Sequence, residues 1–178
     1  MLCTRSPRSS EAKLTIDEVI RFLSQNEDSG QRLLESELRH TVVPAGDAAD
    51  LAQVARTHKL PAELEELWTR AESMRLYEDS VYGQWGLIIL SPADAAAKTR
   101  EMALRRPNDS RPGDLVIGEF LGDSQTIVIR CDEHAGDLGS VLVALPIDPR
   151  QDWPIVGDDL SGFLTKYLEA GGVHFWPH

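Results

Sequence analysis

The segment from Asp114 to Leu145 has the clearest strand pattern in this chain. Two runs of β-branched and apolar residues are joined there by a Gly-Asp turn. A second turn, rich in Gly and Asp, leads into a third such run at 140–145. Consecutive strands joined by short turns predict an antiparallel β-meander.

Helix signals lie before and after this meander. The predicted helix starts are Thr15 with Glu18 as a capping box, Asp47, Pro61, Ser91 with Pro92, and Asp158 or Asp159. The segment 75–90 predicts one or two further strands, whereas 31–43 fits neither the helical nor the strand period. Because strands and helices do not alternate, the predicted fold class is α+β, with a central antiparallel sheet and helices packed against it.

Length and composition favour one domain with an N-terminal extension. The chain has 178 residues, of which 42% are hydrophobic, enough for a core. We expect residues 1–13 to be a disordered tail, 14–45 a helical extension and 46–178 the α+β domain. The last residues, 173–178, are expected to form a short edge strand or a covering tail.

The sequence carries no signal for a membrane or a secretory route. No apolar run reaches the roughly 18 residues that a membrane span needs, and no apolar segment follows the first basic residues. The two cysteines, Cys3 and Cys131, do not suggest a disulfide framework. We therefore expect a cytoplasmic protein with no cofactor.

Charge is unevenly distributed along the chain. The formal net charge is −11, and residues 112–178 hold three basic and eleven acidic side chains, whereas 96–111 holds five basic and two acidic ones. An acidic face repels phosphate backbones, so direct binding of nucleic acid is not expected. It would attract a basic protein partner. The alternative is a solvated surface that only keeps the protein in solution.

No set of residues with catalytic spacing is apparent. Neither cysteine adjoins a histidine, and no serine lies in a Gly-x-Ser-x-Gly motif. A His-Asp dyad formed in space keeps a small-molecule enzyme as an open alternative. The turn with Asp132, Glu133, His134 and Asp137 is rich in oxygen ligands but lacks EF-hand spacing. We interpret it as a solvated hairpin loop and expect no metal site.

Four residues are predicted to have structural roles. Gly122 suits a turn that needs a positive φ, and Asp123 can accept hydrogen bonds from the turn amides. Gly118 lies in the middle of a strand, which indicates a bulge or a close backbone approach. Trp153 is expected to be half-buried and to belong to the core more than to a contact surface.

Several short motifs, taken in their order along the chain, resemble the SUKH superfamily. They are Leu60-Pro61, residues 82–87, 118–124, 150–154 and 163–168. The resemblance covers roughly residues 46–178, and residues 14–45 match nothing within it. The SUKH superfamily includes fungal cell-wall-synthesis regulators and bacterial immunity proteins. The resemblance implies an α+β fold and a non-enzymatic role, typically the binding and neutralisation of a polymorphic toxin, often a nuclease.

The sequence thus leads to two hypotheses from different classes. The first is an immunity protein that binds a basic toxin domain through an acidic surface. Its expected contact residues lie in turns beside the sheet and are Asp132, Glu133, Asp137, Asp148 and Asp152. The second is a regulatory or adaptor module that binds cellular proteins and can form a homodimer, for which the basic segment 96–111 leaves room.

Overall fold

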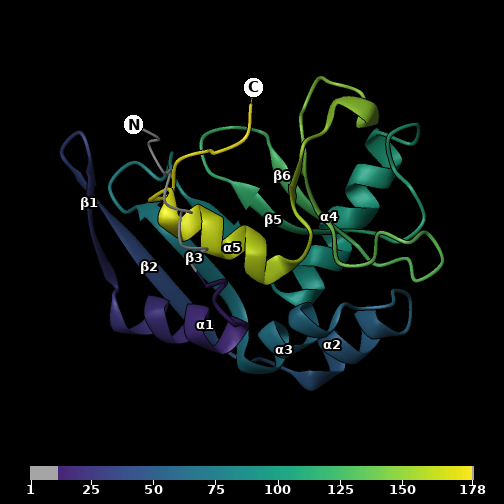
Figure 1. The fold of residues 1–178 in the computed structure, drawn as a ribbon, viewed down its shortest axis with the longest axis horizontal. Helices are drawn as coiled ribbons and strands as arrows, with labels where there is room; N and C mark the ends of the chain where they lie inside the picture. Colours follow the sequence, from purple (N-terminus) through teal and green to yellow (C-terminus); the bar gives the residue numbers. More distant parts are fainter. Residues whose placement is uncertain (1–11, 178) are drawn as a thin grey trace, which may run out of the picture.

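An antiparallel sheet of eight strands, paired in chain order, runs through the molecule in this computed structural model, which describes residues 12–177 (Figure 1). The strands are β1 (Asp28–Leu33), β2 (Ser36–Pro44), β3 (Ala71–Asp79), β4 (Leu87–Ile89), β5 (Asp114–Phe120), β6 (Thr126–Arg130), β7 (Val141–Ala144) and β8 (Ile155–Gly157). The predicted meander corresponds to β5, β6 and β7. The α+β fold class is confirmed.

Five α-helices and one short 3-10 helix accompany the sheet within the described residues. They are α1 (Ile16–Gln25), α2 (Ala48–Ala55), α3 (Ala62–Arg70), α4 (Pro92–Arg105), η1 (Arg150–Asp152) and α5 (Leu160–Glu169). The predicted caps are confirmed: Thr15 and Glu18 form the capping box, and the side chains of Asp47, Ser91 and Asp159 each accept a hydrogen bond from a first-turn amide.

Helices α4 and α5 lie on opposite faces of the sheet. The Glu119 carboxylate of β5 accepts a hydrogen bond from Lys98 of α4, while the next residue, Phe120, packs against Tyr167 of α5. Neighbouring residues of a strand point to opposite faces, so this pair assigns each helix to its side. Helices α1 and α3 join α5 on one face, which faces the viewer in Figure 1.

The predicted helical extension over 14–45 is wrong beyond Gln25. Residues 28–33 and 36–44 form β1 and β2, and β2 pairs with β3 in the central sheet. The side chains of Ser36, Leu38 and His40 are buried, whereas Glu37 and Arg39 between them are exposed. This is a strand period, but two of its three buried residues are polar, which obscured it in the sequence.

The expected N-terminal tail is only partly described. Residues 1–11 lie outside the described residues. Lys13, which was assigned to the tail, forms ion pairs with Asp159 at 2.6 Å and Glu63 at 3.3 Å. The ammonium group can reach both because the starts of α3 and α5 lie beside it, an arrangement that only the tertiary fold creates.

The predicted structural glycines have the roles that were expected of them. Gly118 lies at a register shift between β5 and β6, and a Cβ there would approach the Ile88 carbonyl oxygen to 2.7 Å. Gly122 has φ +82°, and Asp123 accepts a hydrogen bond from the Gln125 amide at 2.7 Å.

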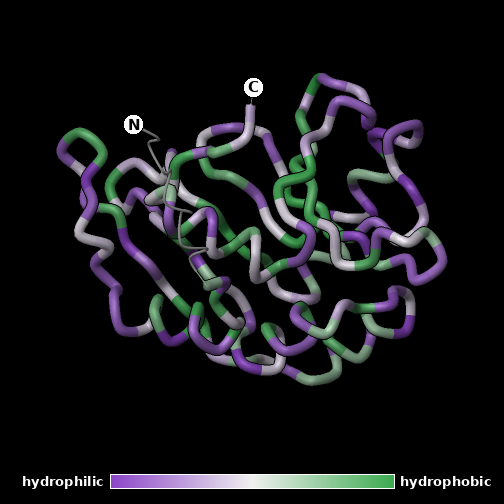
Figure 2. The backbone as a smooth tube through the Cα atoms, in the orientation of Figure 1, coloured by the Kyte–Doolittle hydropathy of each residue, from purple (hydrophilic) through white to green (hydrophobic). Residues whose placement is uncertain are grey.

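Hydrophobic segments concentrate in the middle strands and hydrophilic ones in the connections (Figure 2).

Residues 173–177 form a covering tail and not an edge strand. The Trp176 side chain is 5% exposed, and its indole N–H donates to the Gln125 side-chain oxygen at 3.3 Å. It packs beside Phe120 of β5 and His174 of the tail. This tail therefore closes one end of the core.

Within residues 12–177, no helix has the length and apolar character that crossing a membrane requires.

Candidate partner-binding surface

The five acidic residues expected to contact a partner lie in two connections. Asp132, Glu133 and Asp137 belong to the segment between β6 and β7, and Asp148 and Asp152 to the segment between β7 and β8. Both connections lie on the right side of the molecule in Figure 1. Because β6 pairs with β7 and β7 pairs with β8, each connection links two neighbouring antiparallel strands.

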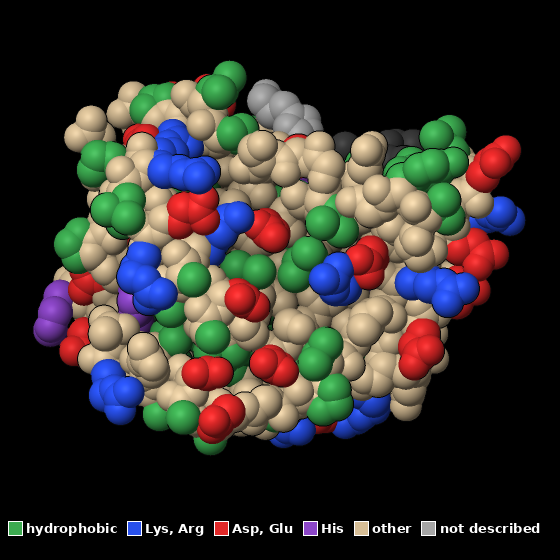
Figure 3. Space-filling view, turned by 180° about the vertical axis from the view of Figure 1, so that it is seen from behind, with side chains coloured by type: hydrophobic (Ala, Val, Ile, Leu, Met, Phe, Trp, Pro, Cys, Tyr) green, Lys and Arg blue, Asp and Glu red, His purple; other side chains and the backbone are tan. Residues whose placement is uncertain are grey.

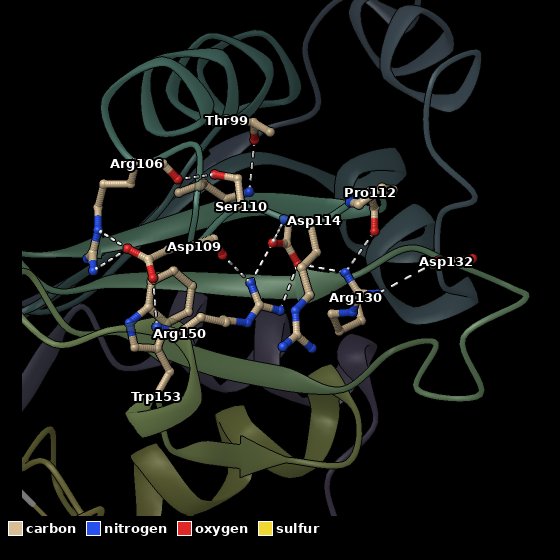
Figure 4. A network of polar contacts seen from close by, with 12 residues as sticks. Thr99, Arg106, Asp109, Ser110, Pro112, Asp114, Arg130, Asp132, Arg150 and Trp153 are labelled. Atoms are coloured by element: carbon tan, nitrogen blue, oxygen red, sulfur yellow. Dashed lines mark hydrogen bonds and ion pairs between the residues drawn. The ribbon is translucent and has the colours of Figure 1, made fainter.

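A buried ion network connects the strands at this end of the sheet (Figure 4). Its centre is Asp114, the first residue of β5, whose side chain is 2% exposed. One carboxylate oxygen accepts from Arg130 at 2.7 Å and from Arg150 at 3.0 Å, and the other accepts from the Arg111 amide at 2.8 Å. A buried carboxylate with this many donors is well satisfied.

The network extends to η1 and to the loop after α4. Asp109 accepts hydrogen bonds from the Arg150 amide at 2.9 Å and from the Arg106 guanidinium at 3.0 Å. The hydrogen bond from the Arg150 amide, with the two guanidinium groups adding to it, lowers the pKa of the Asp109 carboxyl. Arg106 and Arg150 lie over the Trp153 ring, 5.2 and 4.8 Å from its centroid.

Trp153 contributes to the architecture of this connection. Its side chain is buried, and its indole N–H donates to the Asp148 carbonyl oxygen at 3.1 Å. Arg106 donates to the carbonyl oxygens of Leu145 and Asp148. These bonds hold the β7–β8 connection to Arg106, which follows the last residue of α4.

Burial of two arginines changes the charge that this surface presents. Arg130 and Arg150 are two of the three basic side chains in 112–178, and their side chains are only 4% and 8% exposed. Glu133 and Asp152 in the connections are exposed. These two acids thus face solvent, while two of the three basic side chains of the segment lie inside.

The five acids are not equivalent. Asp137 forms an ion pair with Arg130 at 2.8 Å, and Asp132 lies 3.8 Å from the same guanidinium. Asp148 is half-buried and contributes its carbonyl oxygen to the network. Glu133 and Asp152 therefore offer the most accessible carboxylates, whereas Asp132 and Asp137 also neutralise a buried arginine.

Sequence reasoning missed the Asp114–Arg130–Arg150 centre. Arg130 entered only the net charge, and Arg150 only the net charge and the motif at residues 150–154. A signal did exist, since Asp114 begins one apolar strand and Arg130 ends the next, and antiparallel pairing places them opposite each other. The contribution of Arg150 comes from a segment 36 residues away and has no local signal.

Cys131 and His134 were among the residues considered for nucleophilic or metal chemistry. Cys131 is buried, and its burial raises the pKa of the thiol to about 12, so it stays protonated near neutral pH. His134 is exposed, 3.7 Å from the Glu133 carboxylate. Among residues 12–177, no three His, Cys, Asp or Glu side chains converge on a possible metal position. Fixed carboxylates on ordered connections are suited to charge recognition.

Neither a scan against protein-family models nor a search of curated proteins found a match for this chain. The likeness to the SUKH superfamily rests on the motifs in the sequence.

Proposed function

We propose that this chain is a protein-binding module that neutralises a basic toxin domain, the role implied by its resemblance to SUKH immunity proteins. The observation that carries the proposal is the burial of Arg130 and Arg150 beside the exposed carboxylates of Glu133 and Asp152. A nuclease toxin holds phosphates and is basic around its active site. Exposed carboxylates can occupy that site in place of the nucleic acid.

The buried network supports this function by fixing the surface in advance. Asp114 of β5 binds Arg130 and Arg150. Arg130 also pairs with Asp137 of the first connection, and Arg150 lies in the second, so few loop residues need to become ordered when a partner binds. A preformed surface loses less conformational entropy on association. Exposed acids at the rim mainly accelerate association, and this acceleration weakens as salt is added.

The test measures association of the full chain with the toxin domain encoded beside its gene. The variant replaces the three acids that do not pair with Arg130: Glu133→Gln, Asp148→Asn and Asp152→Asn. We expect the association rate constant at low salt to fall about tenfold or more. A matched control replaces three exposed acids on other elements, Glu27, Glu35 and Glu65, with Gln.

The control variant is expected to change the rate less than about twofold, because its acids lie away from the two connections. Equal losses in both variants would mean that only net charge matters. No change in either variant would reject charge recognition by these connections. Asp132 and Asp137 are excluded from the first variant because both lie beside the Arg130 guanidinium, so that replacing them would also alter the buried network.

The adaptor hypothesis is supported by a different feature, the exposed basic side of α4. Arg100 and Arg105 are exposed there and Arg111 follows in the next loop. An adaptor would use this side toward an acidic cellular protein. A neighbouring gene without any toxin domain, together with capture of a cellular protein that is lost on replacing these arginines, favours this second function.

A further inference from the structure

A groove runs between α4 and the outer face of the sheet, on the side of the molecule away from α5. It consists of two adjoining cavities of about 520 and 410 Å³, which share Lys98, Glu101 and Glu119 in their walls. Figure 3 views this side and shows acidic, basic and apolar side chains intermingled on it. The groove exists because α4 crosses the strands without covering them completely.

The floor of the groove is partly apolar. Ile88 and Leu90 line the smaller cavity, and Met102, Val116 and Ala144 line the larger one. A partly apolar floor with polar walls is typical of sites that bind ligands. The groove follows most of the length of α4, from Asp94 to Arg105, so an elongated ligand fits it better than a compact one.

Charges alternate along the wall that α4 contributes. Asp94, Lys98, Glu101 and Arg105 follow one another at spacings of four, three and four residues and all line the groove. At a helical rise of about 1.5 Å per residue, successive charges are about 5.5 Å apart. In an extended peptide, side chains on one side repeat every two residues, or about 6.6 Å. Over four charges the helix advances about 16.5 Å and the peptide about 19.8 Å, so the two patterns drift apart by about 3.3 Å, which the long side chains of Lys98 and Arg105 can span.

We propose that this groove binds an extended peptide segment of a protein partner, in which basic and acidic residues alternate at every second position. The complementary order opposite Asp94, Lys98, Glu101 and Arg105 is basic, acidic, basic, acidic. The intervening residues are small or apolar and lie toward the floor or toward solvent. This proposal does not depend on the acidic connections between β6, β7 and β8.

The ion pairs that line the groove can be exchanged for ion pairs with a ligand. Lys98 lies 2.7 Å from Glu119, and Arg105 lies 3.0 Å from Glu101, with all four side chains at least 32% exposed. Ion pairs this exposed add little to folding stability. A peptide can therefore re-pair these side chains without unfolding the site.

The groove also offers a donor for a peptide carbonyl. Gln125 lines the larger cavity and is largely buried. Its side-chain oxygen accepts from the Trp176 indole N–H, which orients the amide nitrogen away from that bond. The Thr126 and Ser124 side chains line the same cavity. Such donors favour a peptide backbone over a purely charged ligand.

The test measures binding of labelled heptapeptides to the full chain by fluorescence anisotropy. The alternating probe is Lys-Val-Glu-Val-Lys-Val-Glu, and the control probe, Lys-Val-Lys-Val-Glu-Val-Glu, has the same composition in blocked order. We expect the alternating probe to bind about tenfold more tightly, since two of four charge pairs become repulsive in the blocked order. Equal affinities would overturn the proposal.

An exchange variant tests the order of charges on α4 itself. Glu101→Arg combined with Arg105→Glu retains the exposed ion pair but reverses it, so folding stability is preserved. We expect the alternating probe to lose about tenfold in affinity and the probe Lys-Val-Glu-Val-Glu-Val-Lys to regain it. The same exchange in Asp17 and Arg70, an ion pair elsewhere, is expected to leave both affinities unchanged. An effect of that control equal to the exchange on α4 would contradict the assignment.

Discussion

Asp114 illustrates at the residue scale how one carboxylate can order two distant connections. Asp114 binds Arg130, the last residue of β6 before the first acidic connection. It also binds Arg150 of η1, which lies within the second connection. Two buried guanidinium groups without a counter-ion would be costly, because desolvated charges need partners. The residue thus contributes both to folding and to the position of the proposed binding surface.

Replacing Asp114 with Asn should destabilise the fold strongly. The amide preserves the shape but leaves Arg130 and Arg150 without their buried counter-ion, so we expect a loss of about 3–5 kcal/mol in the free energy of unfolding. Urea denaturation checks this. The control is Asp132→Asn, which lies 3.8 Å from Arg130 and is partly exposed, with an expected loss of about 1 kcal/mol or less. Similar losses in both variants would refute the central role of Asp114.

Gly122→Ala should also be destabilising, for a steric reason. Gly122 has φ +82°, and a Cβ there would lie 2.0 Å from the Gln84 carbonyl oxygen. Gly83 has φ +64° but nothing within 4 Å of its Cβ position, so Gly83→Ala isolates the cost of the backbone conformation. We expect about 1 kcal/mol for Gly83→Ala and about 3 kcal/mol for Gly122→Ala in thermal or urea unfolding. Equal costs would show that the collision is relieved.

At the scale of single elements, helix ends were easier to predict than strands. A capping residue and the amide that it binds lie within three residues, so Thr15, Asp47 and Ser91 could be identified from the sequence. Strand β2 was missed because its residues pair with β3 residues far along the chain, from Pro44 with Ala71 to Leu38 with Asp79, and because its buried side chains include His40 and Ser36. Their polar groups are satisfied only by groups that the fold brings to them.

The contact between β2 and β3 contains an unusual backbone position. Tyr77 of β3 has φ +53°, and its amide donates to the His40 ring nitrogen at 3.2 Å. The two rings are 4.5 Å apart and nearly perpendicular. His40 is 2% exposed and its burial lowers the pKa to about 4, so the imidazole is neutral near pH 7 and can accept this bond.

Protonation of His40 should therefore destabilise the sheet in acid. Its pKa is about 4 in the folded protein and 6.5 when unperturbed, so the unfolded state binds more protons between these values. The contribution is complete above pH 6.5 and is lost as the pH falls toward 4. We expect the free energy of unfolding to fall by about 2 kcal/mol more between pH 7 and 4.5 than in His40→Asn, which retains an acceptor. Identical pH profiles in urea unfolding would exclude His40 as the cause.

At the scale of the whole molecule, the sheet depends on its first two strands. Strand β2 lies next to β3, and Ile16, Val19 and Leu23 of α1 are fully or almost fully buried in the core. The resemblance to the SUKH superfamily begins only near residue 46. Strand β2, which pairs with β3, and helix α1, whose apolar residues enter the core, both precede that position.

Removal of residues 1–45 should therefore prevent folding. The truncated chain would have β3 as an uncovered edge and would lose the apolar cover supplied by α1, a combination that leaves unpaired backbone groups and exposed apolar surface. Circular dichroism should show no cooperative thermal transition, in contrast to the full chain. A cooperative transition at an unchanged midpoint would mean that 46–178 folds independently.

Features that arise between close neighbours could be predicted from the amino-acid sequence. The helix starts, the turn at Gly122 and Asp123, and the meander of β5, β6 and β7 all depend on residues a few positions apart. The tertiary structure alone decided that Arg130 and Arg150 lie inside, that β1 and β2 join the sheet, and that α4 borders a groove. Burial depends on contacts between distant segments, so a charge counted along the chain says little about the charge that reaches the surface.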